Sequence, residues 1–93
     1  MNLVYARLAV ADLQRLRAFI AEHAPAAAEP IAHELIQRIE LLREFPDIGR
    51  VVDAAPDPET VRDLIFGSYI VRYVRTASAI IILRIWHHAQ ARG

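Results

Sequence analysis

The last third of the chain contains three β-prone segments joined by very short connections, and this limits the possible folds more than any other feature. Two-residue connections join antiparallel neighbours, whereas parallel strands need a crossover of a dozen residues or more. The sequence therefore predicts an antiparallel meander from residue 61 to 87. Its expected strands are Val61–Phe66, Tyr69–Thr76 and Ala79–His87, connected by Gly67-Ser68 and Ala77-Ser78.

Before this meander the apolar pattern has a helical period. A first helix is expected from about Leu8 to Ala24, ending before Pro25. A second is expected from about Pro30 to Phe45, because proline fits near a first helical turn; the preceding Ala26–Ala28 leaves a helical lead-in open. The apolar stripe of the first helix is Leu13, Leu16 and Ile20.

The remaining segments complete the predicted fold. Leu3-Val4-Tyr5 favours an N-terminal strand, and 46–60 reads as a loop in which Arg50–Val52 could add a short extended piece. Only the helical hairpin is available to cover one face of the sheet. We therefore expect a single α+β domain over residues 1–93, in the order β-α-α-β-β-β, with the hairpin on one face of an antiparallel sheet.

Composition excludes several classes of protein. Without cysteine there is neither a disulfide framework nor a thiolate zinc site. The longest apolar run, Ala79–Leu83, is far shorter than the roughly 20 residues that span a bilayer, and Arg7 and Asp12 interrupt the place of a signal peptide. A soluble cytoplasmic protein is expected. His87 and His88 alternate across a strand, so no metal site is predicted, and three glycines give no nucleotide-binding loop and no cofactor.

Charge is unevenly distributed along a chain whose formal net charge is zero. Residues 1–61 carry six arginines against ten acids, and residues 62–93 carry five arginines against Asp63 alone. Such a split suggests that the C-terminal third meets an anionic partner. The alternative is that the two parts neutralise each other in the folded chain.

The final strand supplies the candidate working surface. Strand alternation separates Arg84, Trp86 and His88, together with Ile80 and Ile82, from Ile81, Leu83, Ile85 and His87. The second set is the more uniformly apolar, so we expect it to face the helices. Arg84, Trp86 and His88, joined by Arg72, then stand on the open face, where they suit contact with phosphates and bases. The alternative is a solvated strand face on which Trp86 covers apolar surface.

The ordered set of elements and motifs resembles the ParE/RelE superfamily of type II toxin–antitoxin toxins across essentially the whole chain. It looks closer to the ParE branch, whose final strand commonly reads as an apolar run, Arg, two apolar residues and His. The motifs are Asp12-Leu13, Pro25–Ala28, Leu42, Phe45-Pro46, Gly49-Arg50, Arg62–Leu64, Gly67–Tyr73 and Ile82–His87.

This resemblance implies a toxin that arrests growth, stabilises a plasmid, and is held inactive in a hetero-oligomer by a cognate antitoxin, ParD-like or similar. ParE-type toxins are associated with poisoning DNA gyrase without being enzymes, whereas RelE-type toxins cleave mRNA in the ribosome. Two departures weaken the nuclease interpretation. Ile70, not arginine, follows Tyr69, and the sequence after the last strand shows no helix bearing a further Arg and Tyr.

The candidate residues follow from these two alternatives. The ParE-like interpretation assigns no catalytic residue; in the RelE-like one, Arg72, Arg84 and His88 would supply the cations and the acid or base of in-line attack. An exposed apolar groove along the first helix or the last strand would receive the antitoxin. The partner-binding candidates are Leu13, Leu16, Ile20, Arg62, Arg72, Arg84, Trp86, His87 and His88.

Overall fold

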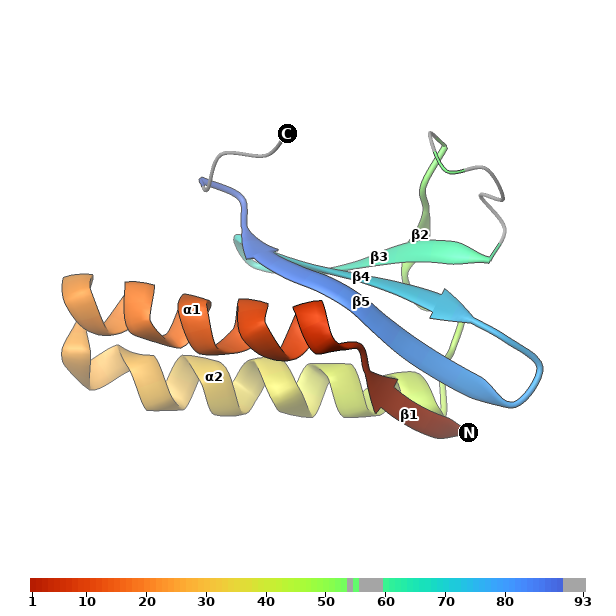
Figure 1. Cartoon of the computed structure of the whole chain (residues 1–93), viewed down its shortest axis with the longest axis horizontal. Coiled ribbons are helices and arrows are strands. Elements are labelled where there is room, and N and C mark those ends of the chain that lie inside the picture. Colours follow the sequence, from red (N-terminus) through yellow and green to blue (C-terminus); the bar gives the residue numbers. More distant parts are fainter. Residues whose placement is uncertain (54, 56–59, 90–93) are drawn as a thin grey trace.

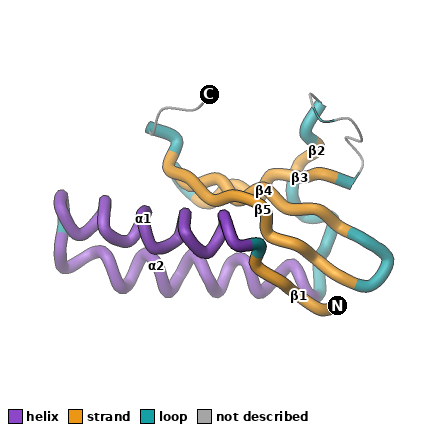
Figure 2. Tube along the Cα trace, in the orientation of Figure 1, coloured by secondary structure: helices purple, strands orange, loops and turns teal. Residues whose placement is uncertain are grey.

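A computed structural model of the chain describes residues 1–53, 55 and 60–89. Two helices form one layer and a twisted sheet forms the other (Figures 1 and 2). None of the described helices is both long and apolar enough to cross a bilayer. The elements are β1 (Asn2–Tyr5), α1 (Arg7–His23), α2 (Pro25–Glu40), the 3-10 turn η1 (Leu41–Arg43), β2 (Arg50–Val51), β3 (Val61–Phe66), β4 (Tyr69–Arg75) and β5 (Ala79–His87).

The sheet contains the predicted meander and extends it at both edges. Its strand order is β1-β5-β4-β3-β2, with β1 parallel to β5 and the other pairs antiparallel. The sheet is therefore mixed and not wholly antiparallel as expected, because the two helices carry the chain from β1 across to the other strands. Gly67, in the β3–β4 turn, has a φ of +56°, a conformation that glycine adopts without steric cost. The α+β fold with a helical hairpin on one face is confirmed. Residues 54 and 56–59 of the predicted loop lie outside the described residues.

The second helix begins five residues earlier than expected. Pro25 occupies its first turn, where a missing N–H costs nothing, and Pro30 lies inside the helix. The sequence prediction placed the start at Pro30 because an internal proline removes one helical hydrogen bond. The strong helix propensity of Ala26–Ala28 and the packing of Ala28 and Ala32 into the core outweigh this loss.

A β-bulge in β5 changes which residues of that strand face the helices, so half of the prediction for this strand is wrong. Tyr73 pairs with Ile82 but Arg72 pairs with Arg84, so Leu83 is an extra residue that shifts the alternation by one position. Before the bulge, Ile80 and Ile82 are buried, so the expectation that Ile81 and Leu83 face the helices is wrong. After the bulge, Ile85 faces the core and Trp86 the opposite side, as expected.

The core lies between the helices and the inner face of β4 and β5, where Val71, Tyr73, Ile80 and Ile82 are fully buried. Tyr73 also fixes the loop after η1, because its hydroxyl donates to the Pro46 carbonyl at 2.8 Å and accepts the Gly49 N–H at 2.9 Å. A Cβ at Gly49 would lie 2.7 Å from the Tyr73 ring. This close approach requires glycine and sets the position from which β2 starts.

Candidate functional site

The open face of the sheet, the side away from the helices, is built from alternate residues of β3, β4 and β5. Val71 and Tyr73 point into the core, so Ile70 and Arg72 point outward, and their cross-strand partners share that side. The predicted group of Arg72, Arg84 and Trp86 does gather here. The residues concerned are Asp63, Ile65, Ile70, Arg72, Arg84 and Trp86.

Arg72 is fixed in place by a buried carboxylate. Its Nε and Nη2 donate to the two carboxylate oxygens of Asp63 at 2.9 and 3.0 Å, a bidentate geometry that guanidinium and carboxylate favour. The hydrogen bond with Asp63 raises the pKa of Arg72 above its already high ordinary value. The guanidinium carbon also lies 5.3 Å from the centre of the Trp86 ring, a cation–π contact. Arg72 and Trp86 therefore form one packed unit with Asp63.

Arg84 is held in the same way by Asp12 of α1. Its Nε and Nη2 donate to Asp12 at 2.7 and 3.1 Å, and the Ile85 N–H donates to the same carboxylate at 2.9 Å. Burial acts to raise the pKa of Asp12, but the hydrogen bonds from Arg84 and Ile85 and the nearby positive charges outweigh it and lower the pKa. The pairing of β1 with β5 ends at Ile82. Beyond that residue, the Asp12 carboxylate accepts the hydrogen bond of the Ile85 N–H at the edge of β5.

Arg62 and Arg75 brace the loop that Tyr73 anchors. Arg62 Nη1 donates to the Gly49 carbonyl at 2.9 Å, and Arg75 Nε lies 3.1 Å from the Asp47 carboxylate, with Arg62 Nε at 3.7 Å from it. Arg62, predicted to bind a partner, is thus mostly buried in a structural contact. Together with the Arg84–Asp12 pair, these contacts show that the two oppositely charged parts of the chain neutralise each other in the fold.

The two adjacent histidines take different surroundings. His87 faces the helical side, with its ring centre 5.8 Å from that of Phe19 and 5.0 Å from that of Tyr69. His88 is exposed beyond the end of β5, and its N–H donates to the Ser68 carbonyl. Within residues 1–53, 55 and 60–89 no three acidic or histidine side chains are grouped so as to hold a metal ion.

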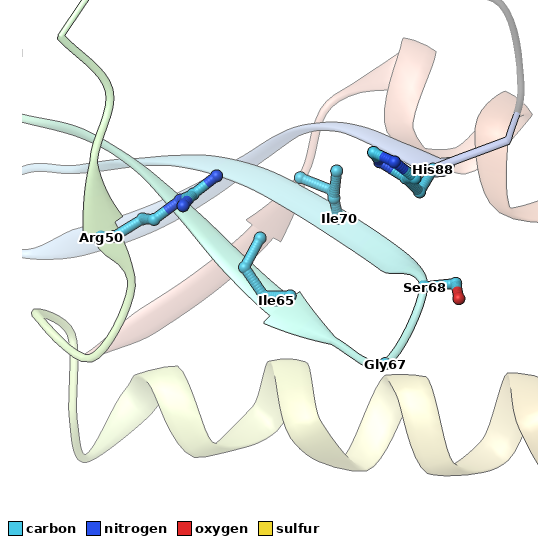
Figure 3. Close-up of a pocket in the computed structure, with 6 residues that line it drawn as sticks. All are labelled: Arg50, Ile65, Gly67, Ser68, Ile70 and His88. Carbon is cyan, nitrogen blue, oxygen red and sulfur yellow. The ribbon is translucent and has the colours of Figure 1, made fainter.

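A hollow of about 320 Å³ lies on the open face beside the β3–β4 turn. Figure 3 shows Arg50 reaching over the sheet toward Ile65 and Ile70, with His88 on the far side of Ile70. Gly67 and Ser68 complete its lining. Arg50 makes no salt bridge with any residue that the structure describes. Among the described residues it is therefore a cation of the open face without an acidic partner.

The apolar groove expected along α1 is absent from the surface. Leu16 and Ile20 are core residues with 2% and 6% of their surface exposed, and Leu13 packs against that core. That part of the prediction is wrong, because the stripe of an amphipathic helix covers the sheet rather than a partner. The exposed apolar side chains are others, among them Val4, Leu8, Leu41, Phe45 and Ile48.

Three polar residues were missed by the sequence interpretation. Asp12 shares the buried helical face of Ala9 and Leu16, and an acid on an apolar stripe was the available signal. Asp63, the only acid of the C-terminal third, offered a weaker one. Arg50 gave only its place in the Gly49-Arg50 motif of the resemblance, because its position on the open face depends on the pairing of β2 with β3.

Comparison with known proteins agrees with this geometry. A chain titled "Chromosomal ParDE TA system from P. aeruginosa" has the same fold, with a TM-score of 0.78 at 22% identity over 94% of this chain and 95% of that chain. The Caulobacter vibrioides protein Toxin RelE2 is 33% identical over 96% of this chain and 97% of its own length. Toxin RelE3 of the same organism is 31% identical over 87% of each.

The sequence model described as "ParE toxin of type II toxin-antitoxin system, parDE" matches residues 3–92. This match covers nearly the whole chain and confirms the resemblance on which the sequence interpretation rests. The chain therefore belongs to the ParE toxin family of type II toxin–antitoxin systems.

Proposed function

We propose that this toxin acts by binding DNA gyrase as a protein ligand, without cleaving RNA, and that a cognate antitoxin neutralises it. One observation carries the proposal: Arg72 on β4 and Arg84 at the β5 edge of the open face are each bound bidentately by a buried carboxylate. The positive charge that an RNA-cleaving site would direct at the reacting phosphate is largely balanced within the protein.

The requirements of RNA cleavage sharpen this argument. In-line attack by a 2′-hydroxyl needs a base, an acid and a cation that stabilises the charge developing on the phosphate. Where RelE-like sequences place an arginine after the tyrosine of the penultimate strand, this chain has Ile70 in the hollow of the open face. An isoleucine supplies neither charge nor a proton, and its side chain suits contact with another protein.

The antitoxin part of the proposal draws on exposed apolar surface. Val4, Leu8 and Leu41 lie on β1, on the first turn of α1 and on η1, and all three are at least 44% exposed. Exposed apolar side chains of this size favour contact with another protein. The solved structural neighbour is titled a ParDE system, which supports a ParD-like partner for this chain.

Purified toxin tests the proposal directly. We expect it to inhibit the supercoiling of relaxed plasmid by gyrase at micromolar concentration, and to leave mRNA intact on programmed ribosomes. Adding the product of the adjacent open reading frame should restore supercoiling. Normal supercoiling together with cleaved mRNA would refute the proposal.

RNA cleavage remains the second candidate because both curated relatives are named RelE toxins and His88 stands exposed at the open face. Alanine substitution of Arg72 or Arg84 is a poor test, since each leaves a buried carboxylate unpaired. His88→Ala removes an exposed side chain and is the cleaner variant. Under this candidate the wild-type toxin cleaves mRNA on programmed ribosomes and the His88→Ala variant does not, whereas a gyrase-binding toxin cleaves no mRNA in either form.

A further inference from the structure

We propose that the toxin binds its target through the hollow between Arg50 and His88. We propose further that this hollow accommodates an acidic side chain of the target beside a branched apolar side chain. This inference rests on the proposed function, since it names the contact surface of the same activity. The hollow has a cation on its β2 side and an apolar floor of Ile65 and Ile70. Both features point to a protein segment as the ligand.

The charge of Arg50 indicates a carboxylate as its ligand. Arg62, Arg72, Arg75 and Arg84 each have an acidic partner within 4 Å, whereas Arg50 has none among the described residues. A guanidinium binds a carboxylate through two parallel hydrogen bonds. The occupant is thus expected to bring one negative charge to the β2 side of the hollow.

The floor of the hollow indicates the rest of the ligand. Ile65 and Ile70 are directly opposite each other on β3 and β4, and Ile65 leaves 44% of its surface exposed. Two adjacent isoleucines on the open face of the sheet form an apolar surface against which a branched apolar side chain of the partner packs. Contact with a partner would remove this apolar surface from water.

Local charge argues against a nucleic acid in this place. A second hollow of about 480 Å³ adjoins the first at Arg50, and Asp53 and Asp63 line it together with Arg72. A polynucleotide carries a phosphate at every step along its backbone and would meet the Asp53 carboxylate there, whereas the charge of Asp63 is balanced by Arg72. Trp86, the aromatic ring available for base stacking on this face, is engaged by Arg72. A single carboxylate on a peptide avoids this repulsion.

The position of the hollow assigns it to the target rather than to the antitoxin. The sheet order is β1-β5-β4-β3-β2, and the hollow draws most of its lining from β2, β3, β4 and the β3–β4 turn. The exposed apolar residues Val4, Leu8 and Leu41 belong to β1, at the opposite edge, and to the segments that follow or contact it. Two separate surfaces therefore serve two partners.

Charge variants at Arg50 test the inference. We compare Arg50→Glu with Arg50→Lys, and use Arg17→Gln as the control, because Arg17 is an exposed arginine paired with Glu29 on the helical layer. Growth arrest on induction, inhibition of gyrase supercoiling and binding to the product of the adjacent open reading frame are measured for each. Unfolding temperatures show that each variant is folded.

Arg50→Glu should abolish growth arrest and weaken gyrase inhibition at least about tenfold, as expected when a charge pair at an interface becomes repulsive. Its affinity for the antitoxin should change less than about threefold, and Arg17→Gln should behave like the wild type. Arg50→Lys keeps the charge but not the paired hydrogen bonds, so its toxicity should fall between that of the wild type and that of Arg50→Glu. Ile65→Asn should lose toxicity while Ile65→Val keeps it. This second pair tests the floor if the charge reversal disturbs folding.

Two outcomes overturn the inference: full growth arrest by Arg50→Glu and Ile65→Asn, or an equal loss of antitoxin binding and toxicity in a folded variant. The proposed function fails in a distinguishable way. In that case the wild-type toxin arrests growth without inhibiting gyrase, and dependence of the arrest on Arg50 still shows that the hollow contacts the target.

Discussion

At the scale of single residues, the Asp12 carboxylate joins α1 to the sheet through several polar contacts. It lies on α1 with 5% of its surface exposed, and it bonds both the Arg84 guanidinium and the Ile85 N–H of β5. A buried carboxylate that accepts a hydrogen bond from the edge of a strand is hard to replace. The corresponding amide has the same size but lacks the charge and one acceptor oxygen.

Asp12→Asn should therefore lower the free energy of unfolding at pH 7 by about 1–3 kcal/mol, the range for a hydrogen-bonded buried group whose partner can return to water. The pKa of Asp12 is lowered in the folded chain, so its stabilising effect is present above its ordinary value of 3.8 and is lost as the pH falls through the folded value. Urea unfolding between pH 7 and pH 2 measures this.

The control is Glu29→Gln, which breaks an exposed pair with Arg17 and should cost less than about 0.5 kcal/mol. The difference between wild type and Asp12→Asn should shrink on acidification. A difference that stays constant down to pH 2 would contradict the role given to the ionised carboxylate.

Two tyrosines offer a matched pair for the loop contact. The Tyr73 hydroxyl serves two backbone groups, those of Pro46 and Gly49, whereas the buried Tyr5 hydroxyl has no partner among the described residues. Tyr73→Phe should destabilise the fold by about 1–3 kcal/mol because it leaves two backbone groups unpaired. Tyr5→Phe should be neutral or stabilising in the same denaturant titration. Equal effects of the two substitutions would refute this account of the loop.

At the scale of elements, α2 contains a proline that the chain tolerates at a cost. Pro30 is exposed in the sixth position of the helix, where its missing N–H leaves the Ala26 carbonyl without its helical donor. Pro30→Ala should raise the free energy of unfolding by about 1–2 kcal/mol, after allowing for the greater freedom of the unfolded chain without proline. Thermal unfolding followed by circular dichroism measures the gain.

Pro25→Ala is the control for this substitution, because a proline in the first turn loses no helical hydrogen bond. Its unfolding temperature should stay within about 2 °C of the wild type, taking a change of about 0.5 kcal/mol or less. A Pro30→Ala variant that is less stable than the wild type would show that Pro30 makes a packing contribution the helix needs.

The elements also show what sequence patterns can and cannot determine. Local signals were sufficient for the meander, since Gly67-Ser68 and Ala77-Ser78 leave only antiparallel pairing open. The bulge at Leu83 escaped prediction because every residue from Ala79 to Leu83 is apolar, so alternation carried no information there. The parallel pairing of β1 with β5 could not be predicted from local signals. It joins residues that are far apart in the sequence, such as Asn2 and Ala79, about 77 positions apart.

The candidate site was predictable only in part for the same reason. Arg72, Arg84 and Trp86 share a face because of strand periodicity, which the sequence contains. Their neutralisation by Asp63 and Asp12, and the approach of Arg50, are set by tertiary register. Strand periodicity therefore identified Arg72 and Arg84, but it could not identify Arg50, which has no acidic partner among the described residues.

At the scale of the whole molecule, the two helices and the sheet bury one core and leave apolar side chains around the β1 edge in water. Val4 and Leu8 are 51% and 57% exposed, and Leu41 and Phe45 are exposed in and after η1. Apolar surface of this kind favours association. The toxin alone should consequently self-associate at concentrations at which its complex with the antitoxin does not.

Antitoxin binding should also stabilise the toxin by mass action, since the partner recognises the folded chain. At a free antitoxin concentration about 100 times the Kd, the gain is about 2.7 kcal/mol. For a domain of this size that raises the unfolding temperature by about 10–20 °C. Differential scanning calorimetry of the toxin with and without the product of the adjacent open reading frame measures it. Leu8→Ser, on the proposed antitoxin surface, should reduce the rise, and Arg50→Glu, at the opposite edge of the sheet, should leave it intact. If instead Arg50→Glu removes the rise and Leu8→Ser does not, the two surfaces have been assigned to the wrong partners.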